Sequence, residues 1–506
     1  MLIQLYGSAL FGVDAHLITI EVNFDKGIGY HLVGLPDNAI KESNYRIAAA
    51  LHNTGYKLPG KKITINMAPA DLRKEGSAYD LPLTMGILTA SHQIEAPTIG
   101  DYILMGEIAL DGSIRPIKGA LPIAIQAWKD GFKGFILPKE NAQEAAVVKH
   151  IAVYGVSHLD EVIAFFKDPK HLSPIQVDAR KLFEGQHNHS LYDFSEVKGQ
   201  ETIKRCMEIA AAGGHNIILI GPPGSGKTML AKRLPSILPP MTLGEALETT
   251  KIHSVLGRIK DKGLVATRPF RSPHHTISDV ALVGGGSYPQ PGEISLAHNG
   301  VLFLDELPEF KRSVLEVMRQ PLEDREVTLS RAKFTVTYPC SFMLVASMNP
   351  SPSGYFEQGN VPSLETQRYL SKISGPLLDR IDLHIEVSPV PFEQLSEKNT
   401  GESSTTIRQR VTAALNVQAL RFKDTALHYN AQMGTKEIQT YCALDKDSLL
   451  LLENAMKKLS LSARAYDRIL KVARTIADLE EKNNLTQEHI AEAIQYRSLD
   501  REGWMG

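Results

Sequence analysis

The chain of 506 residues has few of the features that mark secreted, zinc-stabilised or membrane-spanning proteins. It holds only three cysteines, Cys206, Cys340 and Cys442, which lie far apart and form no CxxC pair. This scarcity argues against both a disulfide framework and a zinc finger, and it fits a reducing compartment. No apolar run approaches the ~18 residues of a membrane span, and Met1 to Gln4 lack the basic flank of a signal peptide. We therefore expect a cytoplasmic protein that makes no membrane contact.

The chain also lacks a strong charge of either sign. Its formal net charge is −2, with 22% charged and 43% hydrophobic residues, which is typical of an ordinary folded protein. Any contact with nucleic acid must therefore come from local basic patches and not from the chain as a whole. At ~150 residues per domain, the length predicts about three or four domains.

Changes in the hydrophobic pattern divide the chain into successive segments and predict an α/β fold. Residues 1–168 alternate short apolar runs with amphipathic stretches, which indicates an α/β domain, and the polar stretch 169–190 is typical of a linker. Residues 191–390 alternate strands with helices, as a parallel sheet with crossovers does. Residues 391–506 have helical spacing and predict a helical lid. In the first segment we expect strands over 17–22, 63–67 and 134–137 and helices over 38–53 and 121–129.

The most informative motif is a glycine-rich loop that follows the apolar run 217–220. Four residues separate its first glycine from its last, so successive backbone N–H groups can curl around phosphates. The lysine would reach the β and γ oxygens, the threonine would offer its hydroxyl to Mg²⁺, and the helix that follows would add its positive end. The motif predicts binding of a nucleoside triphosphate. Its residues are Gly221, Pro222, Pro223, Gly224, Ser225, Gly226, Lys227 and Thr228.

Two acidic residues and an asparagine complete the expected catalytic edge of the sheet. The apolar run 301–304 ends in Asp305 and Glu306. We expect this run to be a strand beside the P-loop strand, which places both acids at the carboxyl edge of the sheet. There Asp305 would hold the Mg²⁺ shell and Glu306 would act as general base on the attacking water. A further strand over 342–346 leads to Asn349, which could orient that water. Taken alone, the acids could also be solvated caps of a buried strand, and Asn349 a simple Asn-Pro turn.

Together these motifs resemble the AAA+ ATPases, in particular the branch that holds magnesium chelatase subunits and MCM helicases. The order P-loop, Asp305-Glu306, Asn349 and then the run 377–382 carries this resemblance. Within the branch, the chain resembles the ComM/YifB family of magnesium-chelatase-like proteins over essentially its whole length. This closer resemblance rests on the runs 268–278, 284–286, 291–293 and 297–300.

The resemblance implies roles for several residues, with ATP and Mg²⁺ as cofactors. Asn349 would be sensor 1, Arg380 the arginine finger that reaches a neighbouring subunit's nucleotide, and Arg464 sensor 2 on the helical lid. A guanidinium on the transferring phosphoryl group raises the rate ~10³- to 10⁵-fold, so dividing the site between subunits makes hydrolysis depend on ring assembly. Val197 and Gln200 lie where this fold usually contacts adenine.

Both arginines also have an ordinary structural alternative. Arg380 could form a salt bridge with Asp379 or Asp382, and Arg464 could be a charge on a helix surface. In either case the charge would serve local stability and not catalysis.

Two basic patches are candidate contacts for DNA. Residues 326–338 alternate apolar and polar on either side of a turn with Arg331 and Lys333, which predicts a β-hairpin with a basic tip. Helicases of the related branch insert such a hairpin into the ring pore, where the two side chains would grip phosphates without reading sequence. Arg268 and Arg271, together with His274 and His275, form the second patch. Two basic residues at a turn are more often merely solvated, but copies around a ring would concentrate positive charge in one channel.

We expect no zinc site. His274 and His275 are adjacent, and adjacent histidines on a loop lack the spacing of a known zinc pattern. Many relatives carry cysteines after the sensor asparagine, whereas this chain has Ser351 and Ser353 at the matching places.

The N-terminal segment resembles the proteolytic domain of Lon, a ribosomal S5 domain 2-like α+β fold. In an ungapped comparison, Ala78 takes the place of the nucleophile and Leu121 that of the lysine, and neither can do this chemistry. Ser77 is one position away and has no lysine partner. The segment therefore looks like a scaffold without a catalytic dyad, suited to ring assembly or DNA guidance. The resemblance is carried by the runs 73–80, 106–117 and 136–141.

As a whole, the resemblance implies a homohexameric, ATP- and Mg²⁺-dependent motor that translocates on branched or single-stranded DNA. The expected function is a branch migration helicase in homologous recombination and natural transformation, and recombination proteins are candidate partners. One alternative is a magnesium-chelatase-type motor that remodels a protein partner. An ATP-dependent Lon-like protease is a more remote alternative.

Overall fold

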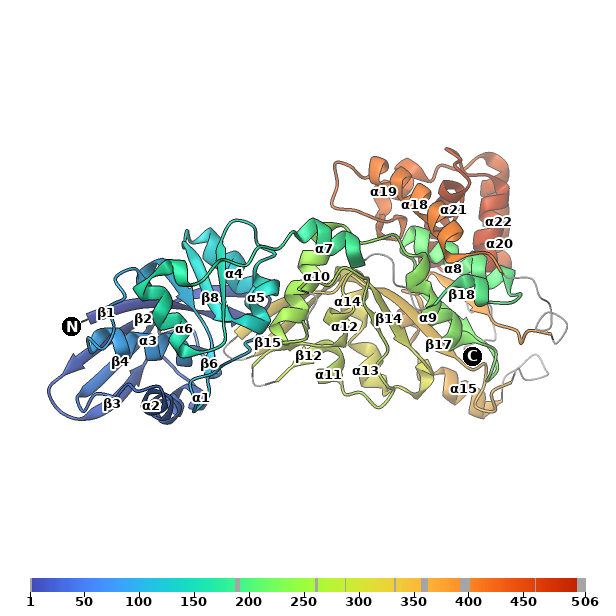
Figure 1. Ribbon diagram of the computed structural model, residues 1–506. Helices are drawn as coiled ribbons and strands as arrows, with labels where there is room; N and C mark the ends of the chain where they lie inside the picture. Colours follow the sequence, from blue (N-terminus) through green and yellow to red (C-terminus); the bar gives the residue numbers. More distant parts are fainter. Residues whose placement is uncertain are drawn as a thin grey trace. The chain divides into compact units, whose positions relative to one another are not determined.

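The computed structural model of the protein describes residues 2–186, 192–259, 263–286, 288–331, 334–355, 363–391, 401–459 and 461–497. The chain folds into two compact units (Figure 1). The first comprises Met1–His187 and Thr242–Thr267, and the second comprises Asn188–Met241 and Arg268–Gly506. Within the described ranges, no helix has both the length and the apolar character needed to cross a bilayer.

The first unit is built on a mixed seven-stranded sheet with the order β3-β4-β2-β1-β5-β8-β9. β1 pairs antiparallel with β2 over its whole length, whereas β1, β5, β8 and β9 run parallel to one another. The expected strands 17–22, 63–67 and 134–137 lie within β2, β4 and β8, because their alternating or continuous apolar residues face the core. The strands are β1 (Leu2–Phe11), β2 (Asp14–Asp25), β3 (Gly29–Val33), β4 (Lys62–Ala68), β5 (Tyr102–Leu104), β8 (Gly134–Pro138) and β9 (Ala152–Val156).

Helices and short turns surround this sheet. α3 is buried at every residue because it packs against β1 and β2. The expected linker contains a helix, α7, which its polar composition did not indicate. The elements are α1 (Asn38–Lys41), α2 (Ser43–Asn53), α3 (Asp80–Ala90), α4 (Ala120–Lys129), α5 (Lys139–Ala145), α6 (Leu159–Lys167) and α7 (Ala179–Gln186), 3-10 turns at Ser77–Tyr79, Ile99–Asp101 and Pro169–His171, and the paired strands β6 (Glu107–Ile108) and β7 (Ile114–Arg115).

A segment from the middle of the chain, Thr242–Thr267, also belongs to the first unit. Its helix α10 (Leu243–Val255) packs against α4. The Gly119 N–H donates to the Ser254 carbonyl oxygen at 3.0 Å, and the Ser254 hydroxyl donates to the buried Glu144 carboxylate. The hydrophobic pattern grouped this segment with the third part of the chain, because periodicity reports local structure and not long-range packing.

The second unit is built on a parallel five-stranded sheet with the order β11-β14-β17-β10-β18. β10, β14 and β17 are buried throughout, because cores lie on both faces of the sheet. Ile217 and Leu219 contribute to one core and Ile218 and Ile220 to the other, as the alternation of side chains along a strand requires. The strands are β10 (Ile217–Ile220), β11 (Phe270–Arg271), β14 (Val301–Leu304), β17 (Met343–Met348) and β18 (Leu383–Glu386).

Helices of the second unit form the flanks of this sheet and a C-terminal bundle. In the bundle, α21 packs against α18 and α22 and also against α8 of the sheet region, so one hydrophobic core joins the two. The flanking elements are α8 (Glu201–Gly213), α9 (Lys227–Ile237), α11 (Asp279–Val283), α12 (Glu293–Leu296), α13 (Arg312–Glu316), α14 (Arg319–Asp324), α15 (Leu364–Leu370) and α16 (Gly375–Leu378), 3-10 turns at Phe194–Glu196 and Leu307–Glu309, and the paired strands β12 (Gly284–Gly285) and β13 (Gln290–Pro291). The bundle comprises α18 (Ser404–Arg421), α19 (Thr435–Tyr441), α20 (Lys446–Lys458), α21 (Ala463–Leu479) and α22 (Gln487–Gln495), with a 3-10 turn at Asn430–Gln432.

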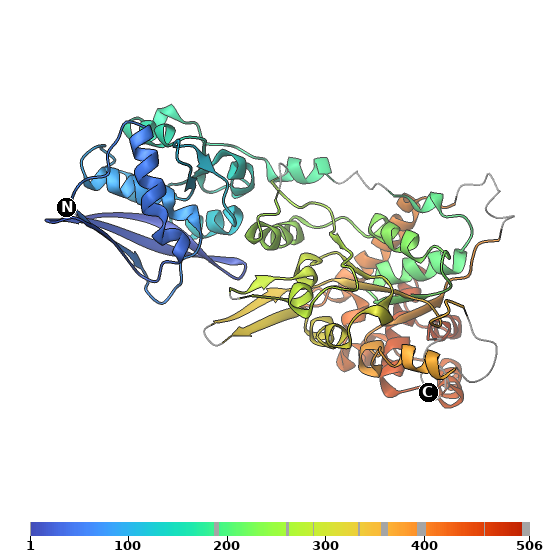
Figure 2. The same ribbon diagram turned by 90° about the horizontal axis from the view of Figure 1, so that it is seen from below.

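A hairpin stands apart from the main sheet of the second unit. β15 (Glu326–Arg331) and β16 (Phe334–Pro339) pair antiparallel, as the alternation over 326–338 predicts. Figure 2 shows the two strands extending from the core as a narrow arm. Val327 and Tyr338 are buried at its root, which anchors the arm to the unit.

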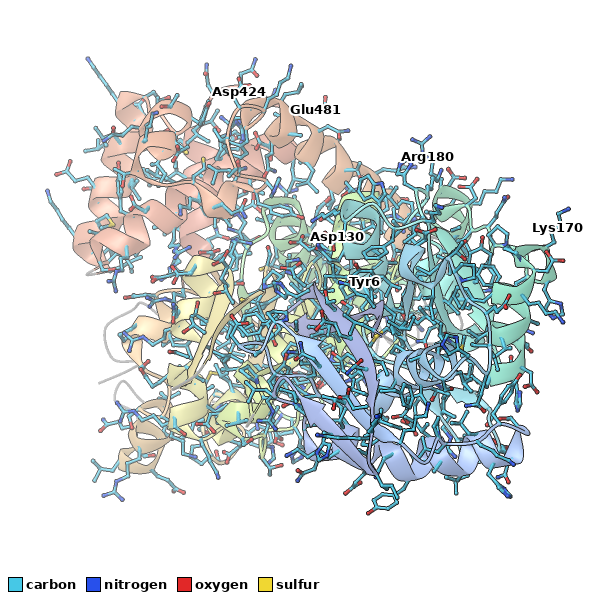
Figure 3. The ribbon with its side chains drawn as sticks, turned by 90° about the vertical axis from the view of Figure 1, so that its left-hand side faces the viewer. Tyr6, Asp130, Lys170, Arg180, Asp424 and Glu481 are labelled. Carbon is cyan, nitrogen blue, oxygen red and sulfur yellow. The ribbon has the colours of Figure 1, made fainter. Side chains whose placement is uncertain are left out.

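Charged side chains of both signs are spread over the surface (Figure 3). Lys170 and Arg180 of the first unit and Asp424 and Glu481 of the second are exposed and point outward. This mixture agrees with 55 basic and 57 acidic residues in the chain. An anionic ligand must therefore be met by a local cluster of basic groups.

Candidate ATPase site

The P-loop connects β10 to α9 in the second unit. Gly224 and Gly226 have φ angles of +77° and +92°, a left-handed backbone that other residues disfavour. At Gly221, an added Cβ would approach the Val387 carbonyl oxygen to 2.2 Å, so this position has room only for glycine. The N–H groups of the loop and of the first turn of α9 are the donors that a phosphate uses at such a helix start.

Lys227, the first residue of α9, links the P-loop to the end of β17. Its Nζ donates to the carbonyl oxygens of Gly221 at 2.7 Å and Pro222 at 2.9 Å, and to Asn349 Oδ1 at 3.2 Å. Burial lowers the pKa of Lys227, while the carboxylates of Asp305 and Glu306 act in the opposite direction. The predicted sensor asparagine thus lies within hydrogen-bond reach of the predicted phosphate-binding lysine.

Asp305 is held by two hydroxyl groups at the carboxyl edge of the sheet. Thr228 Oγ1 donates to Asp305 Oδ2 at 2.8 Å, and Ser347 Oγ donates to the other carboxylate oxygen. Hydroxyl and carboxylate oxygens are the hard ligands that Mg²⁺ prefers, so Thr228 and Asp305 fit a nucleotide-bound magnesium ion. Sequence reasoning missed Ser347, although its position in the strand beside β14 was a usable signal.

Glu306 directly follows Asp305 but faces a different environment. Its φ of +55° is rare for a residue other than glycine, and its side chain is 57% exposed. The Glu306 N–H donates to Ser347 Oγ at 3.3 Å, and His275 Nδ1 lies 3.6 Å from Glu306 Oε2. A solvent-facing carboxylate at this edge can polarise a water molecule. The residues around the P-loop are called the P-loop set: Lys227, Thr228, Asp305, Glu306, Ser347 and Asn349.

The two residues predicted to contact adenine lie near the P-loop but differ in exposure. Val197 is buried in the hydrophobic core. Gln200 directly precedes α8 with φ of +58°, and its Nε2 donates to the carbonyl oxygens of Ser225 at 3.1 Å and Ser388 at 3.2 Å. Gln200 therefore supports the P-loop backbone directly, while a contact with adenine stays a prediction for both residues.

Arg380 and Arg464, called the arginine set, lie together at a separate cavity of 120 Å³. Arg380 Nη2 lies 2.5 Å from Glu323 Oε1, and Arg464 Nη1 donates to Asp379 Oδ2 at 2.8 Å. The cavity wall contains all four of these residues and no member of the P-loop set. The sequence alternatives named Asp379 and Asp382 as ion-pair partners of Arg380, whereas the partner in the structure is Glu323.

A buried network fixes the backbone next to Arg380. Asp382 Oδ1 lies 2.8 Å from Arg468 Nη1 of α21, and its Oδ2 lies 3.1 Å from His215 Nδ1. Burial by itself raises the pKa of Asp382, but Arg468 and His215 outweigh it and hold the pKa well below the usual value. Asn216 Nδ2 also donates to the Arg380 carbonyl oxygen at 2.9 Å. The arginine set is therefore tied both to the helical bundle and to the residue before β10.

The predicted DNA-contacting residues have different surroundings. Arg331 ends β15, its side chain is not among those the structure describes, and Lys333 lies outside the described residues. Arg268 donates from Nε to the Pro239 carbonyl oxygen at 2.7 Å and from Nη1 to that of Asn299 at 2.9 Å. Contact with DNA stays a prediction for all of them.

Arg271 is held by an acidic neighbour. Its Nε and Nη2 donate to the two carboxylate oxygens of Glu293 at 2.6 and 2.8 Å. Such a bidentate pair neutralises the guanidinium charge and satisfies the fork that would otherwise bind a phosphate. A DNA contact through Arg271 therefore requires this pair to open.

No zinc ligand set is formed by the histidines and serines noted in the sequence. His274 Nδ1 lies 3.0 Å from Thr276 Oγ1, and the Ser351 and Ser353 hydroxyls are 2.8 Å apart. Across the described ranges, no group of three or more His, Cys, Asp or Glu is placed to hold a metal ion.

The residues that bear on peptidase activity lie in the first unit. Leu121 is fully buried in α4, and the Ser77 hydroxyl donates to Glu107. Lys74 is buried nearby in the chain, but its Nζ donates to the carbonyl oxygens of Gly34 and Pro69. Ser77 is thus hydrogen-bonded to an acid and not to a lysine, which does not support the protease alternative.

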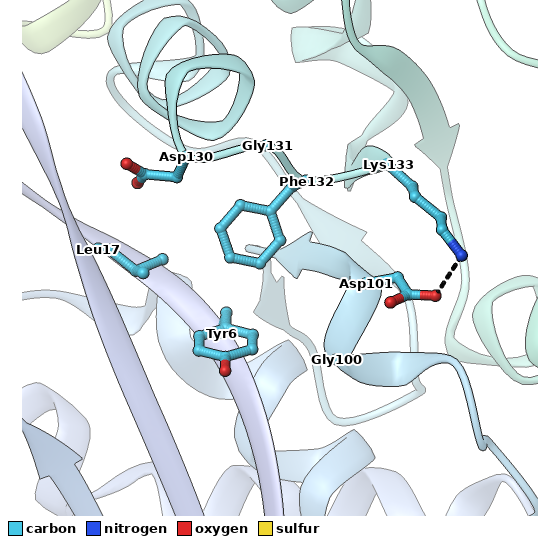
Figure 4. Close-up of a pocket in the computed structure, with 8 residues that line it drawn as sticks. All are labelled: Tyr6, Leu17, Gly100, Asp101, Asp130, Gly131, Phe132 and Lys133. Carbon is cyan, nitrogen blue, oxygen red and sulfur yellow. Dashed lines mark hydrogen bonds and ion pairs between the residues drawn. The ribbon is translucent and has the colours of Figure 1, made fainter.

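A hollow of 360 Å³ in the first unit is lined by charged and aromatic side chains (Figure 4). Lys133 Nζ donates to Asp101 Oδ2 at 2.8 Å, and the Tyr6 and Phe132 rings meet edge to face with centroids 5.1 Å apart. The two opposite charges of Lys133 and Asp101 therefore neutralise each other in the wall of the hollow.

Three family models match the chain segment by segment. "Magnesium chelatase, subunit ChlI" matches residues 193–395, "Subunit ChlI of Mg-chelatase" matches residues 20–141, and "Magnesium chelatase, subunit ChlI C-terminal" matches residues 401–497. With the parallel core sheet and the helical bundle, they define the protein as a magnesium-chelatase-type AAA+ ATPase that uses ATP and Mg²⁺.

Full-length relatives narrow the family further. The YifB proteins of Salmonella typhimurium and Escherichia coli are each 46% identical over 97% of this chain and 96% of their own length. The competence protein ComM of Haemophilus influenzae is 44% identical over 98% of this chain and 97% of its own length. The chain therefore belongs to the YifB/ComM family, which confirms the resemblance predicted from its motifs.

Proposed function

We propose that the protein is a homohexameric DNA motor that hydrolyses ATP to drive branch migration during homologous recombination and natural transformation. The observation that carries this proposal is the division of the nucleotide-site residues into the P-loop set and the arginine set. Each set is held together by its own hydrogen bonds or ion pairs, and they line different parts of one protomer.

This division supports a ring. An arginine on the transferring phosphoryl group accelerates hydrolysis ~10³- to 10⁵-fold, so a P-loop set without such an arginine is a poor catalyst. A neighbouring protomer that presents its arginine set to this P-loop set completes the site. The contact is head-to-tail, and repeated head-to-tail contacts form a ring when the rotation between protomers closes. Six copies is the number that the family resemblance implies.

DNA as the substrate is supported by the hairpin and by a relative. The β15–β16 arm projects from the core, and Arg331 at the end of β15 and Lys333, which precedes β16 in the sequence, would contact backbone phosphates. Repeated around a ring, these side chains would line one channel with positive charge. The relative ComM is named a competence protein, which fits the handling of incoming DNA.

The proposed hydrolysis uses each member of the P-loop set in a separate role. Thr228 and Asp305 hold Mg²⁺, which neutralises charge on the β and γ phosphates. Lys227 exchanges its carbonyl partners for phosphate oxygens, and Asn349, already its hydrogen-bond partner, is left facing the γ position. Glu306 accepts the proton of the attacking water.

The direct test combines an ATPase assay with migration of three- and four-stranded DNA junctions. The purified protein should show DNA-stimulated hydrolysis and should move both junctions, and Lys227→Ala should abolish both activities. Lys232→Ala is a matched control, because Lys232 is an exposed lysine on the same helix. If hydrolysis is indifferent to every DNA structure while the protein is folded and binds ATP, the DNA motor is excluded.

A second candidate is a magnesium-chelatase-type motor that remodels a protein partner. It is favoured by the family models, all three of which describe magnesium chelatase subunit ChlI. Replacing Arg331 and Lys333 with glutamate separates the candidates, because a DNA motor should lose DNA stimulation and keep its basal turnover. The same double reversal at the exposed Lys311 and Arg312 is the control. Unchanged stimulation in the hairpin variant would favour the protein remodeller.

We further propose that the first unit is a Lon-like scaffold without catalysis. Support comes from the buried Leu121 at the place of the lysine and from the Ser77–Glu107 hydrogen bond. A casein-degradation assay with ATP and DNA should therefore show no cleavage.

A further inference from the structure

The side chain of Arg380 is held inside its own protomer. It is only 12% exposed, and its Nη2 lies 2.5 Å from Glu323 Oε1. Its Nη1 donates to the Pro376 carbonyl oxygen, whereas its Nε, although buried, has no hydrogen-bond partner among the described residues. Asn216 fixes the backbone at Arg380 through the carbonyl oxygen. A guanidinium that serves a phosphate of another protomer must therefore leave these partners by a rotation of its side chain.

Glu323 supplies the negative charge in this arrangement. Its side chain lies on α14 and is 56% exposed. An ion pair with an exposed partner shifts an equilibrium by at most about fivefold, so the pair can hold Arg380 and still exchange. Arg464 has a comparable partner in Asp379, but Asp379 directly precedes Arg380 in the chain. Glu323 belongs to a different segment, so its distance from Arg380 can change.

The segment that carries Glu323 continues directly into the β15–β16 arm. Arg325 is the residue that separates α14 from β15. Its carbonyl oxygen accepts from the Cys340 N–H at 2.8 Å, and its Nη1 donates to Ser341 Oγ at 2.9 Å. The chain that leaves β16 is therefore bound to the residue at which the chain enters β15. The end of α14 and both ends of the hairpin thus form one hydrogen-bonded structure beside Glu323.

We propose that Glu323 is a positioning residue of the ATPase, which holds Arg380 in its own protomer until the hairpin engages DNA. The inference rests on the proposed DNA motor and adds a route by which DNA acts on the nucleotide site. Without DNA, the ion pair competes with the neighbouring P-loop set for the guanidinium, and hydrolysis is slow. A hairpin held by DNA shifts the end of α14 and draws Glu323 away, so Arg380 is free to reach the γ phosphate. Glu323 itself contacts no nucleotide and acts only through Arg380.

The test compares ATP turnover without DNA and with saturating DNA. Glu323→Gln removes the charge and keeps the shape of the side chain, so turnover without DNA should rise about two- to fivefold while turnover with saturating DNA stays at the wild-type value. The melting temperature should not change, because Glu323 is exposed. Glu323→Asp keeps the charge and should keep the low turnover without DNA. Glu316→Gln is the matched control, because it removes one negative charge from the neighbouring helix α13 at a site paired with Arg319, and neither rate should change.

Two combined variants show whether the effect passes through Arg380 and whether it bypasses the hairpin. In an Arg380→Ala background, Glu323→Gln should leave single-turnover hydrolysis unchanged, because the group that it releases is absent. The double reversal Arg331→Glu and Lys333→Glu should lack DNA stimulation, and adding Glu323→Gln to it should still raise turnover about two- to fivefold. The second result would show that loss of the ion pair replaces the contact of the hairpin with DNA.

Three results would overturn the inference. They are an unchanged DNA-free turnover in Glu323→Gln, an equal rise in the Arg380→Ala background, and an equal rise with and without DNA. Any of these, obtained while wild-type turnover is stimulated by DNA and depends on Arg380, removes the role of Glu323 and leaves the proposed motor intact. If instead the wild-type turnover is indifferent to every DNA structure, the motor and the DNA-dependent release of Arg380 are both overturned, whatever Glu323→Gln does.

Discussion

Mixing two inactive variants gives a sharp test of a nucleotide site shared between protomers. Lys227→Ala disables the P-loop set and leaves Arg380 intact, whereas Arg380→Ala does the reverse. In the structure, Arg380 is paired with Glu323 of its own protomer and its side chain is only 12% exposed. It therefore has to exchange this partner to reach a phosphate. Each variant alone should retain at most ~10⁻³ of the wild-type turnover.

The recovery on mixing follows from counting interfaces. In a ring assembled at random from equal amounts, the protomer that supplies the P-loop is intact at about half of the sites. Its neighbour supplies an intact Arg380 at about half of these, so about one quarter of the sites are complete whatever the ring size. Turnover should thus return to about a quarter of the wild-type value, which is more than two orders of magnitude above either variant.

The assay is steady-state phosphate release after the two variants are mixed under conditions that allow exchange of protomers. A mixture of Lys232→Ala with Arg380→Ala is the control, and it should reach about one half because every P-loop is intact. Two results would refute the shared site. One is a mixture that stays at the baseline although sedimentation shows mixed rings. The other is an Arg380→Ala protein with nearly wild-type turnover.

Three further predictions concern buried or neighbouring groups. Asp382→Asn should lower the free energy of unfolding of the second unit by ~3–5 kcal/mol, because it leaves Arg468 without its buried partner. The stabilisation from Asp382 is present above its unfolded pKa and should be lost as the pH falls through its depressed folded pKa. Acid titration of the melting temperature checks this pH dependence. Glu144 behaves oppositely, because burial raises its pKa although Ser254 and a backbone N–H donate to its carboxylate. The stability of the protein should therefore fall as the pH rises through the folded pKa of Glu144. At neutral pH, Glu144→Gln should melt at least as high as the wild type, whereas Glu144→Ala should melt at a lower temperature. His275→Asn should reduce kcat about three- to tenfold with little change in KM for ATP, because Glu306 loses the side chain 3.6 Å away that orients it; an equal rise in KM would contradict this role.

The P-loop and the acidic strand end were predictable because their geometry is local. A glycine with φ of +92° at Gly226 is followed directly by a helix, and the fully buried strand over 301–304 is followed directly by Asp305. In both cases the motif and the backbone conformation occupy consecutive residues. The hairpin was predictable for the same reason, since its two strands are close in sequence.

The other parts of the site depend on contacts between distant segments. The Arg380–Glu323 and Arg464–Asp379 pairs join residues 57 and 85 positions apart, and no periodicity reports such pairs. The sequence indicated His275 only as a member of a basic cluster and of a histidine pair, because its place beside Glu306 follows from the path of a loop.

The same dependence on long-range packing explains why several passages of the chain, and not one terminal linker, join the first unit to the ATPase. The chain passes between the units at residues 187–188, 241–242 and 267–268. Two of these passages bound Thr242–Thr267, which continues from α9 and leads into β11, the strand paired with β14. Helix α10 within it is fixed to the first unit through Glu144 and Gly119. The first unit is therefore connected to the ATPase core by three passages of the chain and not by a single linker.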